Sequence, residues 1–462
     1  MKYVSTRSRA PHLGFSDTLL AGLANDGGLY VPEDYPSLRD LPVGDYATMA
    51  AAVIAPYATG PGGVTRVALE RMCADAYATF DHPAVAPLVQ IGPDEWLLEL
   101  FHGPTLAFKD LALQLVGRLF DHVLGERKER ITIVGATSGD TGSAAIDGVR
   151  DCEHVDIVIL YPYGRLSDVQ RRQMTTVDAP HVHTVAVDGT FDDCQDLVKA
   201  MFNDAPFRED LALSAVNSMN WARVMTQVAY YVIAADALGG QPLTFSVPTG
   251  NFGNVLSGWI ARQMGAPVHT LIVGSNANDI LTRFFDTRTM STDLVVPTLS
   301  PSMDIQVSSN FERLLWEING RNGALTAEQL AAFRSSGELR VSDEEFERWI
   351  TPVFRAARFD DEQTMATIAD VHGATGMLID PHTAVGVAAG RARRHLGVPV
   401  VTLATAHPAK FPDAVERATG VRPALPPALG DLFERPERIE RLPNDLVAVQ
   451  DFVRSVAQRP AR

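Results

Sequence analysis

The feature that most constrains this chain is an alternation of two hydrophobic patterns between residues 89 and 275. Short apolar runs rich in β-branched residues take turns with segments of helical spacing, such as 191–203 and 219–238. The apolar runs lie at 131–134, 155–160, 182–187, 243–247 and 268–273, and a further one follows at 398–403. Strands that alternate with helices form mostly parallel sheets covered by helices on both faces. The sequence therefore predicts an α/β fold.

Turn signals and changes of pattern divide the chain further. Its 462 residues are enough for two or three domains. A turn-rich N-terminal segment ends near Asp81-His82-Pro83, and we place its boundary at residue 88. Residues 276–372 interrupt the alternation with charged helical patterns and are interpreted as a helical insertion. The expected units are an N-terminal domain at 1–88, a core at 89–421 and a C-terminal extension at 422–462, with a short helix near 444–457.

Composition argues against several classes of function. A net charge of −16 repels a nucleic-acid backbone, so no nucleic-acid partner is expected. Cys73, Cys152 and Cys194 are too scattered for a zinc or redox pair, and we expect them in the core. No apolar stretch approaches the length of about 18 residues that a membrane helix needs, and the N-terminus lacks the apolar centre of a signal peptide. We therefore expect a cytoplasmic protein with no membrane association and no metal site.

A single lysine stands at the start of a predicted helix. Lys109 follows the turn Gly103-Pro104 and precedes apolar residues at helical spacing. The helix dipole disfavours a positive charge at this end, and apolar surroundings add to that effect. Both favour the neutral amine, which is the form that condenses with an aldehyde. The alternative is a surface lysine whose stem packs along the protein.

Three loops follow predicted strands, at the end where open α/β sheets bind ligands. The loop at 135–143 offers hydroxyls and backbone N–H groups to an anion, although the same residues could simply cap a helix. The loop at 248–254 contains two glycines and favours a phosphate over a structural turn. In the loop at 403–411, Thr405 could hydrogen-bond a ligand, whereas His407 is interpreted as a core or capping residue. An amine, a phosphate cradle and one polar group are what pyridoxal phosphate needs.

Longer motifs carry a resemblance to a known family. They lie at 15–17, 20–24, 26–30, 102–110, 135–142, 217–223, 248–254, 300–305 and 405–411. In these motifs the chain resembles the long bacterial and fungal type of threonine synthase, within the tryptophan-synthase-β-like superfamily of pyridoxal-phosphate enzymes. The resemblance implies a two-lobed core that binds pyridoxal 5'-phosphate, with the smaller lobe at about 110–210.

The resemblance also implies residue roles. Lys109 would bind the cofactor aldehyde covalently and transfer protons, and Thr405 would hydrogen-bond the pyridine nitrogen. The cofactor phosphate would be held by Gly250, Asn251, Phe252, Gly253 and Asn254. The substrate carboxylate would contact Thr137, Ser138 and Thr141, while Asp140 stands where the superfamily often has an asparagine at the ring hydroxyl. Candidates for the substrate phosphate are Asn217, Ser218, Asn220, Arg223 and Lys410, of which Arg223 could equally belong to a structural ion pair.

The implied reaction converts O-phospho-L-homoserine and water to L-threonine and phosphate, by γ-elimination followed by β-addition of water. A serine/threonine dehydratase or a β-replacement enzyme would use the same cofactor, and a non-catalytic phosphometabolite-binding protein would use the same loops. The segment at 26–32 and the long insertion resemble threonine synthase only. Both a monomer and a homodimer are compatible with the sequence.

Overall fold

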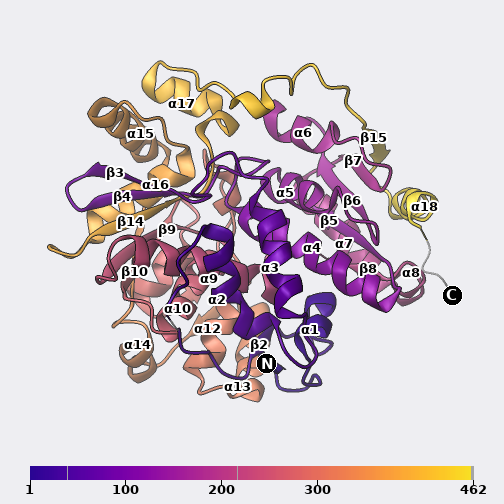
Figure 1. The fold of residues 1–462 in the computed structure, drawn as a ribbon, viewed down its shortest axis with the longest axis horizontal. Coiled ribbons are helices and arrows are strands. Elements are labelled where there is room, and N and C mark those ends of the chain that lie inside the picture. The colour runs from indigo at the N-terminus through magenta and orange to yellow at the C-terminus, as the bar shows by residue number, and fades with distance from the viewer. Residues whose placement is uncertain (39, 216, 459–462) are drawn as a thin grey trace.

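The computed structural model describes residues 1–38, 40–215 and 217–458, and its two main sheets lie side by side, each with helices packed on it (Figure 1). The larger sheet has six strands in the order β13-β10-β9-β14-β4-β3. The strands are β3 (Leu88–Gly92), β4 (Glu95–Glu99), β9 (Leu243–Pro248), β10 (Val268–Ser275), β13 (Phe354–Arg358) and β14 (Val400–Ala404). All neighbours are parallel except β3 and β4. Helices α10 (Gly253–Gln263) and α16 (Pro381–Arg393) pack against this sheet.

The smaller sheet has five parallel strands in the order β15-β7-β6-β5-β8. They are β5 (Ile131–Ala136), β6 (Val155–Pro162), β7 (Val182–Asp188), β8 (Leu213–Ser214) and β15 (Glu440–Pro443). Every residue of β6 is buried, as expected for a central strand that is covered on both faces. The helices of this lobe are α5 (Asp140–Val149), α6 (Asp168–Thr175), α7 (Phe191–Asn203) and α8 (Ala205–Asp210). The six strands expected from apolar runs are confirmed.

The N-terminal segment packs its helices across the junction of the two lobes. Its elements are β1 (Tyr3–Ser5), α1 (Phe15–Ala21), β2 (Tyr30–Pro32), α2 (Tyr46–Ala58) and α3 (Arg66–Tyr77). Helix α2 packs on α9 (Trp221–Ala237), and α3 packs on α4 (Lys109–Arg127). Trp221, at the start of α9, contacts the rings of Tyr3 and Tyr57. The segment therefore braces the two helices whose first turns carry Lys109 and Arg223.

The insertion at 276–372 is not purely helical, which corrects the sequence interpretation. Strand β13 joins the larger sheet as its edge, and β11 (Thr289–Ser291) pairs with β12 (Glu338–Arg340). Arginines at 355 and 358 are partly exposed at this edge and break up the apolar run that signals a strand. The helices of the insertion are α11 (Ile280–Thr287), α12 (Phe311–Ile318), α13 (Gly323–Ser336), α14 (Asp343–Trp349) and α15 (Asp361–Thr375).

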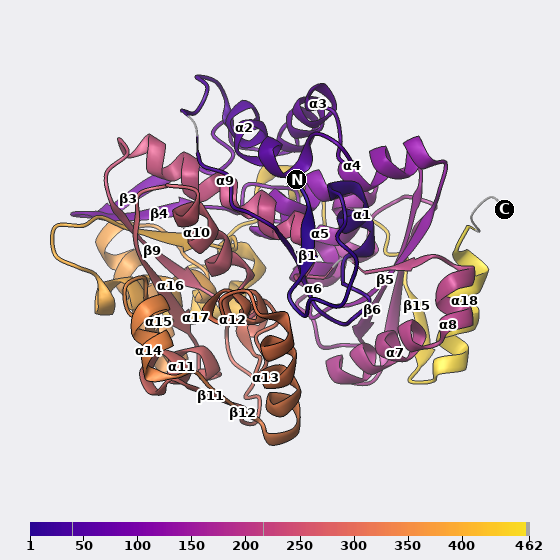
Figure 2. The same ribbon diagram turned by 90° about the horizontal axis from the view of Figure 1, so that it is seen from below.

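The C-terminal part returns from the larger lobe to the smaller one. After β14 the chain forms α17 (Pro412–Thr419), runs past the smaller lobe and adds β15 to the edge of its sheet (Figure 2). The expected terminal helix is α18 (Leu446–Val456), which packs on α7. In the described part of the chain, no helix combines the length and the apolar character needed to cross a membrane.

Candidate functional site

Lys109 and the strand-end loops meet in one cavity between the lobes. Its walls come from the first turns of α4, α5, α9, α10 and α16, from the turn Pro301–Met303 of the insertion, and from the segment after β14. The lining residues are Phe108, Lys109, Asp140, Thr141, Ser218, Arg223, Gln227, Pro248, Thr249, Gly250, Asn251, Gly253, Asn254, Ser302, Met303, His382, Thr405 and Ala406. Several helix N-termini thus converge on the cavity, which makes it suited to an anionic ligand.

Lys109 is the first residue of α4, and its side chain is buried. Its Nζ lies 3.3 Å from Oδ2 of Asp140 and 4.8 Å from the centre of the Phe108 ring. Burial lowers the pKa of Lys109, and the nearby charges of Lys410 and Arg223 lower it further, while Asp140 opposes them. The direction agrees with the prediction that this amine favours its neutral form, and the surface-lysine alternative is wrong.

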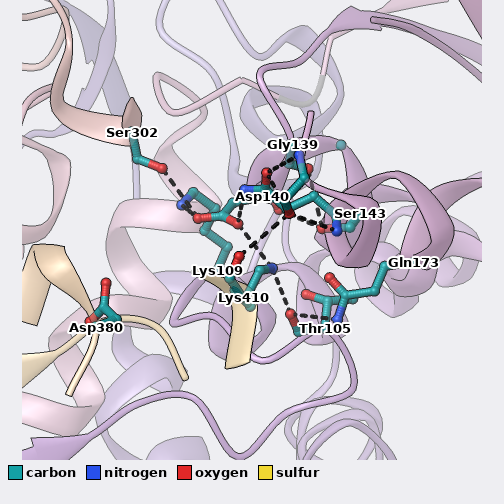
Figure 3. Close-up of polar contacts among 12 residues, drawn as sticks. Thr105, Lys109, Gly139, Asp140, Ser143, Gln173, Ser302, Asp380 and Lys410 are labelled. Carbon is teal, nitrogen blue, oxygen red and sulfur yellow. Dashed lines mark hydrogen bonds and ion pairs between the residues drawn. The ribbon is translucent and has the colours of Figure 1, made fainter. Parts of the chain in front are cut away.

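Asp140 lies between two lysines (Figure 3). Its Oδ1 is 2.9 Å from Nζ of Lys410 and accepts a hydrogen bond from Gln170, and its Oδ2 accepts one from Ser302 at 3.2 Å. Burial alone would raise the pKa of Asp140, but Lys410 and Lys109 outweigh it and hold that pKa well below its usual range. Asp140 is therefore a fixed negative charge beside the reactive amine.

Lys410 lies behind Asp140 and does not line the cavity. Its side chain is fully buried, and its Nζ also donates to the carbonyl oxygen of Thr105 at 2.7 Å. The expectation that it binds substrate phosphate is not supported by this position, because both contacts are made within the protein. The neighbouring His407 caps the turn Pro408–Lys410 through its Nδ1, which confirms its interpretation as a capping residue.

The loop between β9 and α10 has the shape of a phosphate cradle. A Cβ atom added to Gly250 would lie 3.1 Å from Ile305, so the close approach of the turn 301–305 requires glycine there. Phe252 has a φ of +61°, and its side chain packs on Phe311 and not in the cavity. Asn254 accepts hydrogen bonds from Tyr230 and Tyr231, while its buried Nδ2 has no partner among the described residues.

Arg223 is a buried cation without a counter-ion among the described residues. Its side chain is 3% exposed, it lines the cavity, and its Nε and Nη1 have no hydrogen-bond acceptor in that part of the protein. Burial lowers its pKa to about 10. The ion-pair alternative is therefore wrong within the described residues. A buried donor group of this kind needs an anion to satisfy it.

The remaining predicted residues divide into two groups. Thr141, Ser218, Asn251, Gly253 and Thr405 line the cavity. Three of the others form hydrogen bonds within the protein instead. Thr137 accepts hydrogen bonds from the backbone of Gly139 and Gly142, and Asn217 accepts one from the backbone of Met219. Asn220 caps α9 and donates to the carbonyl oxygen of Leu19, whereas Ser138 is exposed.

The cavity also contains residues that the sequence analysis missed. Ser302 and Met303 come from the insertion, Gln227 from α9 and His382 from the first turn of α16. The sequence Asp380-Pro381-His382 has the cap and proline that mark a helix start, but this signal does not reveal which way the histidine points.

The donors and acceptors of this cavity fit pyridoxal phosphate. A buried amine is available for the aldehyde, and Nδ2 of Asn254, which has no partner among the described residues, is available for an oxygen of the cofactor phosphate. The free N–H groups of Arg223 are available for a second anion. The Thr405 hydroxyl is available for a ring nitrogen. The fit thus rests on a buried amine, on the N–H groups of Asn254 and Arg223 that have no acceptor within the described residues, and on the glycine cradle.

Comparisons with known proteins agree with this chemistry. Family models described as threonine synthase N terminus, pyridoxal-phosphate dependent enzyme, and threonine synthase C-terminal match residues 2–77, 82–339 and 383–453. Threonine synthase from Pseudomonas aeruginosa is 54% identical, with 98% of each chain covered. The crystal structure of PLP-bound threonine synthase from Brucella melitensis superposes with a TM-score of 0.96 at 50% identity and covers 99% of this chain and 100% of its own. Yeast threonine synthase gives 0.92 at 37% identity over 98% of both chains.

Proposed function

The chain belongs to the threonine synthase family, and from that membership we propose that it converts O-phospho-L-homoserine and water to L-threonine and phosphate. The observation that carries this proposal is Arg223, which lines the cavity with Lys109 and the glycine loop and whose Nε and Nη1 have no acceptor among the described residues. Cofactor and substrate each bring a phosphate, so the cavity needs two anion sites. The loop at 250–254 supplies one, and Arg223 with Ser218 supplies the other.

The cofactor is assigned to residues on three walls of the cavity. Lys109 binds its aldehyde, the loop from Gly250 to Asn254 with the α10 N-terminus binds its phosphate, and Thr405 accepts or donates at the ring nitrogen. When bound, pyridoxal phosphate supplies an electron sink next to the substrate α-carbon. A neutral hydroxyl at the ring nitrogen adds no charge there, unlike a carboxylate.

The chemistry that falls to the protein is mainly proton transfer. Burial lowers the pKa of Lys109 and so favours its neutral amine, the form that can remove a proton from the substrate carbons and return it later. Asp140 holds the Nζ of Lys109 in place at 3.3 Å, and its own charge is fixed by Lys410. Because Asp140 stays ionised, the ammonium that forms when Lys109 takes up a proton has a counter-charge within reach.

Substrate selection is assigned to two ends of the cavity. The first turn of α5, with Thr141, presents backbone N–H groups to the α-carboxylate. Arg223 and Ser218 bind the γ-phosphate, and the developing charge on the departing phosphate strengthens that contact. A substrate without a phosphate leaves the guanidinium of Arg223 unpaired, which selects against it.

Two product assays test this function on the same cofactor-loaded protein. One measures phosphate released from O-phospho-L-homoserine, and the other measures keto acid released from L-threonine. We expect phosphate release, accompanied by threonine, to dominate. Dominant keto acid would instead assign the chain to the dehydratase reaction, and neither product would assign it to a binding protein.

We further propose the division into an N-terminal domain at 1–88, a core at 89–421 and an extension at 422–462. The insertion around 276–372 belongs to the core, because β13 is part of the larger sheet. A reducing, cytoplasmic location is supported by the cysteines, all three of which are buried as free thiols.

A further inference from the structure

A histidine–carboxylate pair forms one wall of the cavity and has no part in the roles assigned above. Asp380 caps α16, and its Oδ2 lies 2.7 Å from Nδ1 of His382. The same oxygen accepts the backbone N–H of His382, and the other oxygen accepts from the backbone and hydroxyl of Thr383. Asp380 is fully buried, and His382 is 3% exposed. The pair is therefore rigid, and one edge of its imidazole faces the cavity.

The hydrogen bonds of this pair determine the tautomer of His382. An ionised carboxylate only accepts hydrogen bonds, so Nδ1 must carry the hydrogen that it donates to Asp380. Nε2 lies 3.3 Å from the backbone nitrogen of Ser302, which only donates. Both contacts are satisfied together by the neutral imidazole with its hydrogen on Nδ1.

Ser302 belongs to the turn Pro301–Met303, which the insertion places over the cavity. Two hydrogen bonds from Ser302 connect this turn to other walls of the cavity. The Ser302 hydroxyl donates to Asp140, the carboxylate beside Lys109, and the Ser302 backbone N–H donates to His382. The Asp140 bond depends on a rotatable hydroxyl, whereas the His382 bond fixes the main chain itself.

We propose that Asp380 and His382 form a positioning pair that holds the turn Pro301–Met303 closed over Lys109 and the substrate. Asp380 sets the tautomer of His382, and His382 in turn accepts the Ser302 N–H. Met303 then stays against Gly250: a Cβ atom added to Gly250 would lie 3.2 Å from the Cα of Met303. The pair acts through the main chain of the insertion and does not exchange protons with the substrate.

Hydrogen–deuterium exchange of the segment around Ser302 tests the proposal on the full-length, cofactor-loaded protein. His382→Ala removes the acceptor. Asp380→Asn keeps a helix-capping oxygen but offers an amide N–H to Nδ1, which moves the imidazole hydrogen to Nε2 and turns the acceptor toward Ser302 into a donor. The matched control is His154→Ala, which breaks a His154–Asp121 pair of similar length, 2.9 Å, outside the cavity.

We expect exchange at the Ser302 amide to become about tenfold faster in His382→Ala and in Asp380→Asn, the loss corresponding to one hydrogen bond. In His154→Ala it should stay at the wild-type rate. The visible absorption of the cofactor at Lys109 should be unchanged in all three. Unchanged exchange in His382→Ala would overturn the proposal. So would faster exchange in His382→Ala with a wild-type rate in Asp380→Asn, because His382 would then act by packing on Phe411.

A measurement on the unmodified protein keeps the proposal testable if a variant does not fold. ¹⁵N spectra of histidine-labelled protein report which ring nitrogen carries hydrogen, and the His382 signal is assigned by its loss in His382→Gln. Hydrogen on Nδ1 is expected, and hydrogen on Nε2 would overturn the proposal. The kinetic consequence rests on the proposed function: KM for O-phospho-L-homoserine should rise about tenfold while kcat changes less. If the wild-type protein released no phosphate, only the proposed function would fall, since exchange and tautomer do not depend on it.

Discussion

Replacing Arg223 by methionine should make the cofactor-free protein more stable and the enzyme much less active. Methionine keeps most of the length of the side chain and removes the charge. In the cofactor-free protein the guanidinium of Arg223 is buried, and its Nε and Nη1 have no acceptor among the described residues. Its removal therefore takes away an unfavourable group, whereas the same group is needed when a phosphate is bound.

The size of the stability effect follows from the pKa. Burial lowers the pKa of Arg223 from its usual value to about 10, which corresponds to about 3 kcal/mol. At pH 7 the group is charged in both the folded and the unfolded chain, so the whole penalty is present there. It is relieved only as the pH rises through the folded-state pKa. Arg223→Met should therefore raise the free energy of unfolding of the cofactor-free protein by up to about 3 kcal/mol at pH 7.

The size of the kinetic effect follows from the lost donors. A hydrogen bond to a charged group contributes about 1.5–3 kcal/mol, and two such donors together contribute about 3–6 kcal/mol. The value of kcat/KM for O-phospho-L-homoserine should therefore fall by about 10²- to 10⁴-fold.

Arg313 provides a matched control, because it is equally buried and its pKa is also lowered to about 10. Each of its three guanidinium nitrogens donates a hydrogen bond, to the carbonyl oxygens of Tyr30 and Met219 and to the side chain of Asn310. Arg313→Met relieves a similar burial penalty but leaves three acceptors unpaired, at about 1–3 kcal/mol for each, so its net effect should be lower stability.

Thermal melting of both cofactor-free variants and phosphate-release kinetics test this contrast. We expect a higher melting temperature with low activity for Arg223→Met and a lower melting temperature for Arg313→Met. If Arg223→Met melted below the wild type, or kept its kcat/KM, the assignment of Arg223 as an anion site would be refuted. Loss of cofactor binding in Arg223→Met would move the assignment from the substrate phosphate to the cofactor phosphate.

Three further predictions concern the rest of the cavity. Lys109→Ala should abolish both the visible absorption of the loaded protein and phosphate release, as measured by spectrum and product assay. Asp140→Asn removes the charge that raises the pKa of Lys109, so the pKa of Lys109 should fall further. Stopped-flow absorbance should therefore show the pH midpoint of cofactor association at lower pH than in the wild type. Gly250→Ala should weaken cofactor affinity in titrations, because the added Cβ would press on Ile305. The control is Gly373→Ala, at an exposed position of α15 with open space around it. It should leave cofactor affinity unchanged and raise the free energy of unfolding by about 0.5–1 kcal/mol in melts.

The parts of the fold that the sequence predicts are those with strong local signals. The buried parallel strands are nearly continuous apolar runs, and the ligand loops directly follow them, so both can be found within windows of a few residues. Strand β13 lacks such a run, because its arginines at 355 and 358 face outward from a sheet edge. The sequence pattern therefore predicts a helical insertion where this strand lies. The pairing of Asp140 with Lys410 joins residues 270 positions apart, and no local pattern carries that information.

The net charge of the chain likewise does not predict the charge inside the cavity. A value of −16 describes the whole surface, whereas charges more than about 8 Å away in solvent are largely screened. Inside the cavity, Lys109 and Arg223 lie beside Asp140, so the local balance is positive even in an acidic protein. Under the proposed function, affinity for the phosphorylated substrate should depend on these few buried groups and on helix N-termini.

Two residues beside the cavity show how function overrides local preference. Leu106 and Phe252 have φ values of +62° and +61°, in a region that costs a non-glycine residue about 1–2 kcal/mol. Nothing in their identities predicts this conformation. Phe252 is held by packing on Phe311, and the carbonyl of Leu106 accepts the N–H of His407. Each lies within three residues of the first turn of a helix, α4 or α10, whose N-terminus faces the cavity. Tertiary contacts therefore sustain the strain at both positions, directly before two helices whose first turns line the cavity.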